Sequence, residues 1–279
     1  MAPWKYTDDS YKEYTRTTWN ESAQTYSKIL RWLEPYGFDL VALVDPKIHE
    51  RALDIATGPG EPALTMARMV GPEGDVVGID LSEKMIERAT NSAKERRILN
   101  AAFRVMDAEK MDFPDDTFDL AASRFGFQIF TNPEAAAAEA YRVLKPRGRV
   151  GATVWSTAEK AAALHVIVGP MLEFAEPDET GYLPTPYELG GPGEMVKLLE
   201  DAGFSEAKED RKTHSFVWKD EADYLETILG GTPLGHSLKE EDPPVQKKIL
   251  ARTRENLRKW RKGRTIEIPC ECVIVTARK

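Results

Sequence analysis

The chain carries the stretch Arg51-Ala-Leu-Asp-Ile-Ala-Thr-Gly-Pro-Gly60, in which a short apolar run leads into an acid and a turn of small residues. The residues that follow, Glu61-Pro-Ala-Leu-Thr-Met-Ala-Arg-Met-Val70, place apolar side chains at helical spacing, and Gly71-Pro72 ends the pattern. Glycine lets the backbone approach a ligand closely, and the first N–H groups of a helix have no partner within it. The stretch therefore predicts a strand, a tight turn and a helix that together bind a nucleotide-containing cofactor.

Length, composition and charge narrow the class of protein. The 279 residues can bury one sizeable core and leave room for a lid or cap. The formal net charge of -8 argues against a general nucleic-acid binder, whose domain is usually basic, and favours a small-molecule partner. The sequence opens without a signal-peptide pattern and has no apolar run of about 18 residues, so we expect no integral membrane segment and a cytoplasmic location. A homodimer is left open.

Beyond the turn, short apolar runs alternate with helical patterns. The expected strands are 75–80, 101–106, 118–124 and 149–155. Helices are expected after Ser82, a favourable N-cap, and from Asn132-Pro133 to Leu144. Strands that alternate with helices indicate an α/β fold with a mainly parallel sheet.

The two ends of the chain have different patterns. The first 45 residues are rich in Trp, Tyr and Phe, and from Trp19 apolar residues recur at helical spacing until Pro35-Tyr36-Gly37, which we expect to end the helix. This helix either packs on the domain or forms a lid over a ligand. After residue 156 we expect a helix (158–174), a Pro/Gly-rich loop (177–192), a helix (193–202), a strand (207–218), an interrupted helical region (219–262) and a strand (267–276).

The glycine turn fits two kinds of cofactor. Gly58-x-Gly60-x-x-Ala63, with Asp80 about twenty residues later, matches the dinucleotide fingerprint. Asp54, however, stands four residues before Gly58, where a dinucleotide turn normally has an apolar strand. An acid and a small residue, Asp107-Ala108, also follow the third strand, where they can contact an adenine edge.

Four motifs together resemble those of the class I S-adenosylmethionine-dependent methyltransferases, in particular the ubiquinone/menaquinone-biosynthesis type (methyltransferase domain 11-like). They are Leu53-Asp-Ile-Ala-Thr-Gly-Pro-Gly60, Gly78-Ile-Asp-Leu-Ser82, Asp107-Ala-Glu-Lys-Met-Asp-Phe-Pro-Asp-Asp-Thr-Phe-Asp119 and Arg142-Val-Leu-Lys-Pro-Arg-Gly148. The match covers about residues 50–156. The rest of the chain agrees with the family only in the general order of its helices and strands. Ala56 departs from the glycine that many relatives carry. The resemblance implies a Rossmann-like, doubly wound sheet of seven mainly parallel strands, with an antiparallel last strand and helical lid or cap insertions.

Carried over residue by residue, the resemblance assigns a site for S-adenosylmethionine and its product S-adenosylhomocysteine. The residues expected at the methionine part are Ala56 and Gly58, with Asp54 bracing the turn. Asp80 is expected to accept hydrogen bonds from both ribose hydroxyls. The adenine is expected to lie against Leu81, Met85, Asp107 and Ala108, and the reactive sulfonium to face Ser123, Arg124 and Phe125.

The expected chemistry needs little beyond positioning. A sulfonium methyl is already activated, so in-line displacement mainly requires a nucleophile held against it. A base matters only for a hydroxyl or carbon acid, and His165 is the candidate, with a merely packed or solvated histidine as the alternative. Tyr11, Tyr14 and Trp19 are placed to enclose the sulfonium, because aromatic faces attract cations. No cluster of metal-binding residues occurs in the sequence.

The sequence thus predicts a methyltransferase for a small-molecule O-, C- or N-nucleophile. The expected parts are an N-terminal helical lid (1–45), a cofactor-binding core (46–156) and a C-terminal part (157–279) with a helical cap (219–262). Two alternatives remain: a protein that binds the cofactor without methyl transfer, or serves another reaction, and a nicotinamide-dependent oxidoreductase. The basic run 252–264 is either a solvated helix face or a contact for a membrane or anionic substrate. Cys270 and Cys272 are expected to be half-buried apolar residues.

Overall fold

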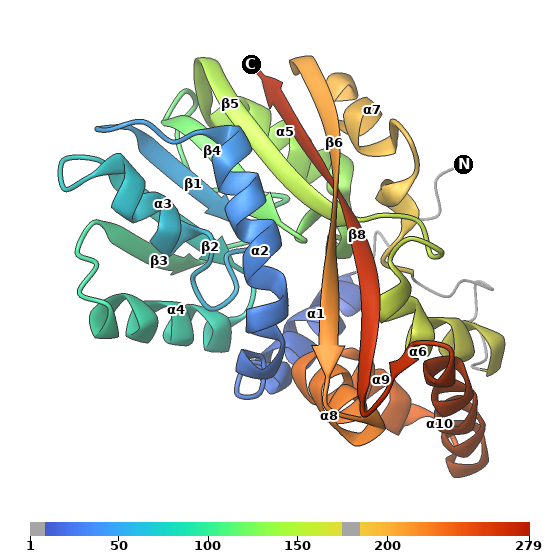
Figure 1. The fold of residues 1–279 in the computed structure, drawn as a ribbon. Helices are drawn as coiled ribbons and strands as arrows, with labels where there is room; N and C mark the ends of the chain where they lie inside the picture. Colours follow the sequence, from blue (N-terminus) through green and yellow to red (C-terminus); the bar gives the residue numbers. More distant parts are fainter. Residues whose placement is uncertain (1–8, 175–184) are drawn as a thin grey trace.

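Helices and strands alternate along most of the chain (Figure 1). The computed structural model describes residues 9–174 and 185–279, with side chains from Lys12 onward. The strands are β1 (Arg51–Ile55), β2 (Asp75–Asp80), β3 (Ala101–Val105), β4 (Phe118–Arg124), β5 (Leu144–Trp155), β6 (Ser205–Trp218), β7 (Arg261–Lys262) and β8 (Thr265–Arg278). The α-helices are α1 (Asp9–Ser22), α2 (Ser27–Val44), α3 (Ala63–Val70), α4 (Glu83–Glu95), α5 (Pro133–Val143), α6 (Ala162–Phe174), α7 (Glu194–Asp201), α8 (Glu221–Gly231), α9 (Leu234–Glu240) and α10 (Pro243–Arg258). Two short 3-10 helices are η1 (Phe127–Ile129) and η2 (Glu188–Gly190).

One sheet organises the molecule. Its strand order is β3-β2-β1-β4-β5-β8-β6, and the two-residue β7 pairs with β8 beside this path. The strands from β3 to β5 are parallel, whereas β8 runs antiparallel to both β5 and β6. The expected seven-stranded, mainly parallel sheet with an antiparallel last strand is therefore confirmed. Chain order reverses between β1 and β4, and open α/β sheets bind ligands at such a point.

Helices cover both faces of the sheet (Figure 1). One buried cluster joins the sheet to α2, α3 and α4, and the other joins it to α5 and α7. A parallel sheet covered on both sides needs nearly continuous apolar strands, which explains why β1 and β4 are almost wholly buried. The helices α1, α6, α8 and α9 lie beyond the carboxyl ends of the parallel strands (Figure 1).

The helix prediction for the N-terminal region was wrong at two points. The chain breaks between α1 and α2, and α2 continues through Pro35 to Val44. Its buried side chains recur on one face well past the proline, from Ile29 through Tyr36 to Val44. An interior proline costs a helix about 3 kcal/mol, whereas burial of each large apolar side chain contributes about 1.5–3 kcal/mol. Packing of this stripe on the sheet therefore outweighs the local signal.

Cys270 and Cys272 are completely buried and free, rather than half-buried as expected. Their strand, β8, has neighbours on both sides, and both side chains point into the cluster beneath α2. Burial raises the pKa of the Cys270 thiol to about 12.

A buried hydrogen bond ties α2 to β8, because the Tyr36 hydroxyl donates to the Cys270 carbonyl at 2.6 Å. Tyr36→Phe is expected to lower the free energy of unfolding by about 1–2 kcal/mol, since removal of one partner of a buried hydrogen bond costs about that much. Urea denaturation would measure the change. Tyr141→Phe is the control, because the Tyr141 hydroxyl has no hydrogen bond to a described residue. Equal losses in the two variants would contradict the prediction.

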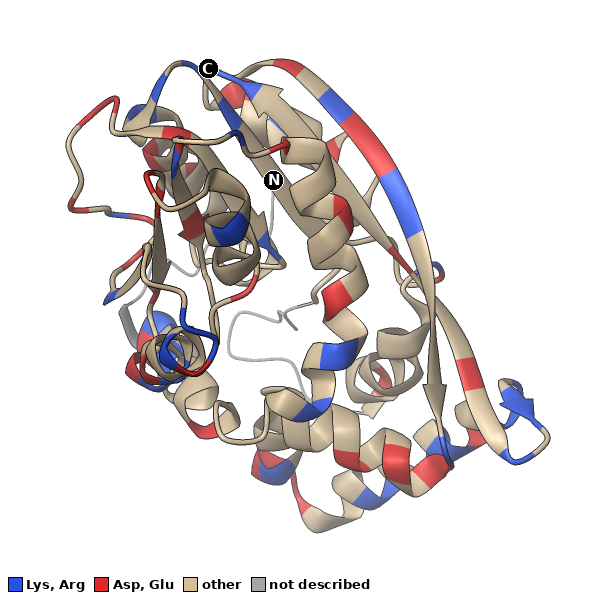
Figure 2. Ribbon diagram, turned by 60° about the vertical axis from the view of Figure 1, so that its left-hand side comes forward, with Lys and Arg blue, Asp and Glu red and all other residues tan. Residues whose placement is uncertain are grey.

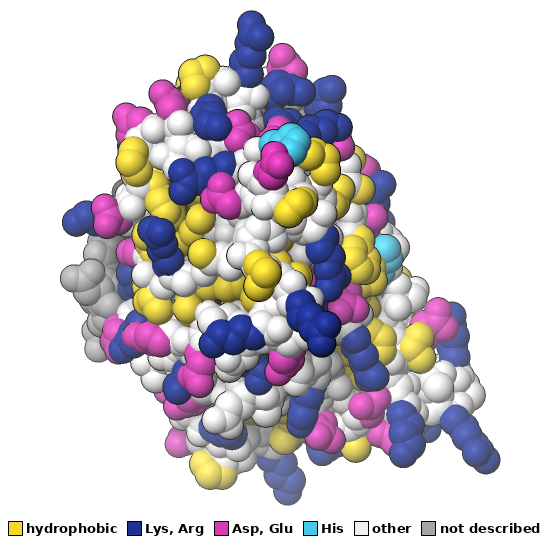
Figure 3. Space-filling view, turned by 90° about the vertical axis from the view of Figure 1, so that its left-hand side faces the viewer, with side chains coloured by type: hydrophobic (Ala, Val, Ile, Leu, Met, Phe, Trp, Pro, Cys, Tyr) yellow, Lys and Arg dark blue, Asp and Glu magenta, His cyan; other side chains and the backbone are white. Residues whose placement is uncertain are grey.

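The edge of the sheet at β3 is exposed. Val105 at its end is 48% exposed and Leu99 just before it is 96% exposed. On this side of the molecule apolar side chains are interspersed with Lys, Arg, Asp and Glu (Figure 3). Charged neighbours of this kind discourage an edge strand from pairing with another chain. Among the residues that the structure describes, none of the helices has the length and apolar character required to span a membrane.

Candidate active site

A pocket lies at the carboxyl ends of the parallel strands, where chain order reverses. It holds about 1120 Å³ of space, part of which is open to solvent. The predicted site residues that line it are Trp19, Ala56, Gly58, Asp80, Leu81, Met85, Asp107, Ala108, Arg124 and Phe125. Residues far apart in the sequence thus meet at one edge of the sheet.

Asp54 lies behind the glycine turn rather than in the pocket wall. It is fully buried, and its Oδ2 accepts hydrogen bonds from the Thr57 hydroxyl at 2.6 Å and the Ala63 N–H at 2.9 Å. One carboxylate oxygen therefore joins the turn to the start of α3, and burial raises the Asp54 pKa to about 7. Ala56 and Gly58 have φ values of 58° and 54°, in the left-handed region that favours glycine.

Asp80 joins this turn to the end of β2. Its carboxylate accepts hydrogen bonds from the Gly58 N–H at 2.8 Å and the Ser82 N–H at 2.9 Å. Burial raises the Asp80 pKa to about 6, although the hydrogen bonds from the Ser82 and Gly58 N–H groups act in the opposite direction. A carboxylate has about four acceptor positions, so two remain for other donors.

Asp107 faces a partner that the sequence did not suggest. Lys12 of α1 places its Nζ at 2.7 Å from Asp107 and 2.6 Å from Glu109. Burial lowers the pKa of Lys12, but the hydrogen bonds and charges of the two acids outweigh it and leave the pKa raised. The N-terminal helix is therefore anchored beside the residues assigned to the adenine.

The remaining contacts of α1 are also mainly polar. Arg16 pairs with Glu83 of α4 at 2.6 Å. Asn20 donates to Glu83 at 3.0 Å and accepts from the Ser82 hydroxyl at 2.7 Å. Because the Ser82 hydroxyl also accepts the Met85 N–H as the α4 cap, α1 is tied to the start of α4.

Other side chains of α1 reach the cap helix α9. The Tyr14 hydroxyl donates to Glu240 at 3.0 Å, and Glu21 lies 2.7 Å from His236. Tyr14 is not among the residues that line the pocket, so its predicted contact with the sulfonium has no geometric support. The side chain of Tyr11 lies outside the described residues.

The end of β4 is held in one conformation. Ser123 is buried behind the pocket, where its hydroxyl donates to the Ile55 carbonyl at 2.9 Å. Phe125 has a φ of 62°, an unusual value for a bulky residue. Its N–H bonds both the carbonyl (3.0 Å) and the hydroxyl (3.1 Å) of Thr153, and its ring stacks on Trp155 at 4.1 Å. These contacts maintain the strained turn that presents Arg124 and Phe125 to the pocket.

Part of the pocket wall is apolar and aromatic. Its residues include Trp19, Tyr26, Ile29, Leu33, Trp155 and Leu164. They come from α1, the start of α2, β5 and α6, which lie far apart in the sequence. The sequence showed Tyr26 and Leu33 as a helical apolar stripe, but not that both residues line the pocket.

His165 does not line the pocket, although the preceding Leu164 does. Successive helical side chains point about 100° apart, so the imidazole lies elsewhere, edge-on to Tyr187 at 5.7 Å. Burial lowers the pKa of His165. The geometry therefore does not support His165 as a base. Within the described ranges 9–174 and 185–279, no cluster of residues suited to a metal ion occurs.

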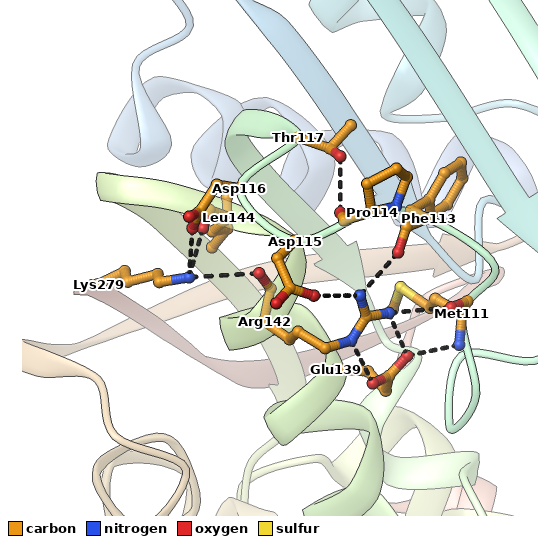
Figure 4. A network of polar contacts seen from close by, with 10 residues as sticks. All are labelled: Met111, Phe113, Pro114, Asp115, Asp116, Thr117, Glu139, Arg142, Leu144 and Lys279. Carbon is orange, nitrogen blue, oxygen red and sulfur yellow. Dashed lines mark hydrogen bonds and ion pairs between the residues drawn. The ribbon is translucent and has the colours of Figure 1, made fainter.

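The loop after β3, which carries Asp107 and Ala108, is fastened by Arg142 of α5 (Figure 4). Its guanidinium donates to the Met111 carbonyl at 2.9 Å, the Phe113 carbonyl at 2.7 Å and Asp115 at 2.8 Å. Glu139 holds the same guanidinium and also accepts the Met111 N–H at 2.6 Å. The motif that begins at Arg142 therefore supports from behind the loop that carries Asp107 and Ala108.

Several Lys and Arg residues lie on α10 and the turn after it (Figure 2). The exposed ones are Lys247, Lys248, Arg254, Arg258, Lys259, Arg261, Lys262 and Arg264. None of them lines the pocket. The predicted solvated helix face agrees with this exposure, and a role in binding an anionic substrate within the pocket does not.

Comparison with known proteins identifies the chain's family. A family model for a methyltransferase domain matches residues 52–148. Aklanonic acid methyltransferase DauC of Streptomyces sp. (strain C5) is 35% identical over 147 residues, which cover 52% of this chain and 67% of that protein. The ubiquinone/menaquinone biosynthesis C-methyltransferase UbiE of Burkholderia cenocepacia (strain HI2424) is 34% identical over 167 residues, which cover 57% and 68%. The chain belongs to the class I S-adenosylmethionine-dependent methyltransferases.

Solved structures agree with this fold. YcgJ from Bacillus subtilis gives a TM-score of 0.60 at 19% identity, over 87% of this chain and 97% of that one. The [4+2]-cyclase SpnF gives a TM-score of 0.54 at 25% identity, over 86% and 79%. The predicted resemblance and the predicted small-molecule methyltransferase activity are thus confirmed, and S-adenosylmethionine is the cofactor.

The residues of this methyltransferase fit that cofactor. A side chain added at Gly58 would point into space with no protein atom within 4 Å, so the turn leaves room for a ligand. The two open acceptor positions of Asp80 suit a pair of ribose hydroxyls. Two buried polar atoms have no hydrogen-bond partner among the described residues. Asp54 Oδ1 lies behind the pocket wall, and Arg124 belongs to the wall itself with its Nη1. We therefore propose that Asp80 binds the ribose and that the turn at Ala56 and Gly58 binds the methionine part.

Affinity for S-adenosylhomocysteine is expected to rise with pH through about 6 and then to level off. In the empty protein Asp80 is protonated at pH values below its pKa of about 6. Only the ionised carboxylate can accept hydrogen bonds from both ribose hydroxyls. Below this pKa, binding requires loss of the proton, so affinity is expected to fall about tenfold per pH unit. Calorimetry across this range would measure the effect, and Asp80→Asn should remove it. An unchanged pH profile in Asp80→Asn would contradict the assignment.

Proposed function

We propose that this methyltransferase methylates a flat, largely apolar, ring-bearing acceptor. The observation that carries the proposal is the aromatic wall of the pocket. Phe125 stacks on Trp155, and Trp19 meets Tyr26 edge-on at 5.8 Å. Apolar pockets lined by aromatic side chains bind ligands of the same character, with few polar groups to orient them.

Residues outside the central motifs supply this wall. Trp19 comes from the segment assigned as a lid (1–45), and Leu164 and Thr232 come from the C-terminal part (157–279). Their positions support the proposed division into a lid, a cofactor-binding core (46–156) and a C-terminal part whose cap (219–262) helps to enclose the acceptor. A cytoplasmic location, a homodimer and the absence of a nucleic-acid partner stay predictions.

Bound S-adenosylmethionine supplies a methyl group on a positively charged sulfur, ready for in-line displacement. The protein's own part in the reaction is positioning. Asp80 and the turn at Ala56 and Gly58 would fix the cofactor, while Phe125 and Trp155 would hold the acceptor ring. Correct alignment of the reactants can lower the barrier by about 7–11 kcal/mol, whereas a general base typically raises the rate by about 10²–10⁴-fold. With His165 outside the pocket wall, we favour acceptors that ionise readily, such as phenols, enols and acids.

Incubation with methyl-labelled S-adenosylmethionine and a panel of acceptors tests this proposal. The expected result is label in a bicyclic or larger phenol, enol or acid, and none in small flexible amines or in RNA. Label only in amines or RNA would overturn the proposed acceptor class.

A second candidate is a further reaction in the same pocket, in addition to methyl transfer, with the cofactor bound but not consumed. The similarity to the [4+2]-cyclase SpnF favours it, since the two folds align over most of both chains. The same incubation separates the candidates, because methyl transfer must release S-adenosylhomocysteine. Product formation from an acceptor without that release would favour the second candidate.

A further inference from the structure

Arg124, at the end of β4, is a buried cation that pairs with no described residue. It is 7% exposed, it lines the pocket, and its Nη1 has no hydrogen-bond partner among the described residues. Buried charges in proteins are normally paired or hydrogen-bonded, because removal of an ion from water costs several kcal/mol. An unpaired guanidinium in a pocket wall therefore suggests a ligand that completes it.

The nearby protein groups do not neutralise Arg124. Asp54 feels its charge, but the Asp54 carboxylate bonds Thr57 and Ala63 and forms no ion pair with it. The other cations that line the pocket are Lys12 and Arg16, and both are paired with acids. Within the described part of the chain, Arg124 is thus the pocket-lining cation without an acidic partner.

The position of Arg124 is fixed by its surroundings. The strained turn at Phe125 is held by two hydrogen bonds to Thr153 and a ring stack on Trp155. A side chain at Gly37 of α2 would come within 3.4 Å of Arg124 Cδ, so the missing side chain makes room for the arginine stem. A charged group held in this way is preorganised for an anion.

We propose that Arg124 is the anion-binding subsite of this pocket, and that it binds a carboxylate or a comparable anionic oxygen. This inference rests on the proposed function. Two ligands in the same pocket carry that chemistry: the cofactor, through the carboxylate of its methionine part, and an acidic acceptor. In either case the guanidinium aligns a reactant beside the ring of Phe125.

Four probes and three variants test the proposal by calorimetry. S-adenosylhomocysteine carries the methionine carboxylate and methylthioadenosine lacks it. A hydroxynaphthoate carries an acceptor-like carboxylate and the corresponding naphthol lacks it. Arg124→Met removes the charge and Arg124→Lys keeps it. Arg104→Met, on β3 outside the pocket, is the control for loss of an arginine.

Arg124→Met is expected to lower the affinity for one carboxylate probe about ten- to a hundredfold, as for the loss of a charged hydrogen bond. The affinity for its neutral counterpart should not change. If only the affinity for S-adenosylhomocysteine falls, the subsite binds the cofactor. If only the affinity for the hydroxynaphthoate falls, the subsite binds the acceptor. Arg124→Lys should recover part of the affinity. Unchanged binding of both carboxylate probes, or equal loss of each acid and its neutral partner, would overturn the inference. A wild-type protein that binds no S-adenosylhomocysteine would instead refute the proposed function.

Discussion

Asp80→Ala is expected to lower affinity for S-adenosylhomocysteine by about a hundredfold or more, and Asp107→Ala by about tenfold or less. Hydrogen bonds to a charged group contribute about 1.5–3 kcal/mol each, and we assign two such bonds, from the ribose hydroxyls, to Asp80. Asp80 also accepts the Gly58 N–H, so its loss frees the turn that faces the methionine part. Asp107 is assigned a single bond to the adenine amine, which water can partly replace.

Titration calorimetry on folded variants checks this order. Asp75→Ala is the matched control, because Asp75 lies at the opposite end of β2, where it is exposed and pairs with Arg51. Asp107→Ala also removes the ion pair with Lys12. The variant Lys12→Ala measures this effect by itself, because it removes the ion pair and keeps the Asp107 carboxylate. Equal losses in Asp80→Ala and Asp107→Ala, or a larger loss in the second, would show that the ribose assignment is wrong.

Deletion of residues 1–22 is expected to leave the fold intact and to slow turnover at least a hundredfold. The helix α1 adds Trp19 to the pocket wall, whereas no strand of the sheet depends on it. Misplacement of a reactant by about 1 Å can cost 10²-fold in rate, and an open pocket also admits water. Turnover of the truncated chain, with circular dichroism as a check of folding, would measure the effect.

We further propose that α1 is a lid that opens in the empty protein. Among its described side chains, the buried ones are the small Thr18 and Ser22, and most of its other contacts are polar, including those of Lys12 with Asp107 and Glu109. Elements with few buried apolar contacts open at low free energy. Cofactor product should therefore slow proteolysis and hydrogen exchange in α1. Equal protection with and without product, or full activity of the truncated chain, would mean that α1 only packs on the domain.

Much of the fold and the cofactor side of the pocket was predictable from sequence, because their signals are local. Asp54, Asp80 and Asp107 each follow or end an apolar run, and parallel strands bring such ends together. The extension of α2 through Pro35 was not predictable, because it depends on packing against a sheet formed later in the chain.

Long-range contacts explain the remaining differences. The pairing of Lys12 with Asp107 joins positions 95 residues apart, and nothing near Lys12 in the sequence indicates it. His165 was a plausible base by its position on a helix after β5, yet a rotation of one residue puts Leu164 in the pocket instead. Tyr14 faces α9 for the same reason: the side chain's direction follows from how the helix is docked, not from its composition.

A crystal structure of the protein with S-adenosylhomocysteine tests the central assignment most directly. The account predicts both ribose hydroxyls within hydrogen-bond distance of Asp80, the adenine between Met85 and Ala108, and the sulfur directed toward Phe125 and the aromatic wall. A product molecule bound elsewhere, or bound in this pocket with no contact between its ribose and Asp80, would contradict the account.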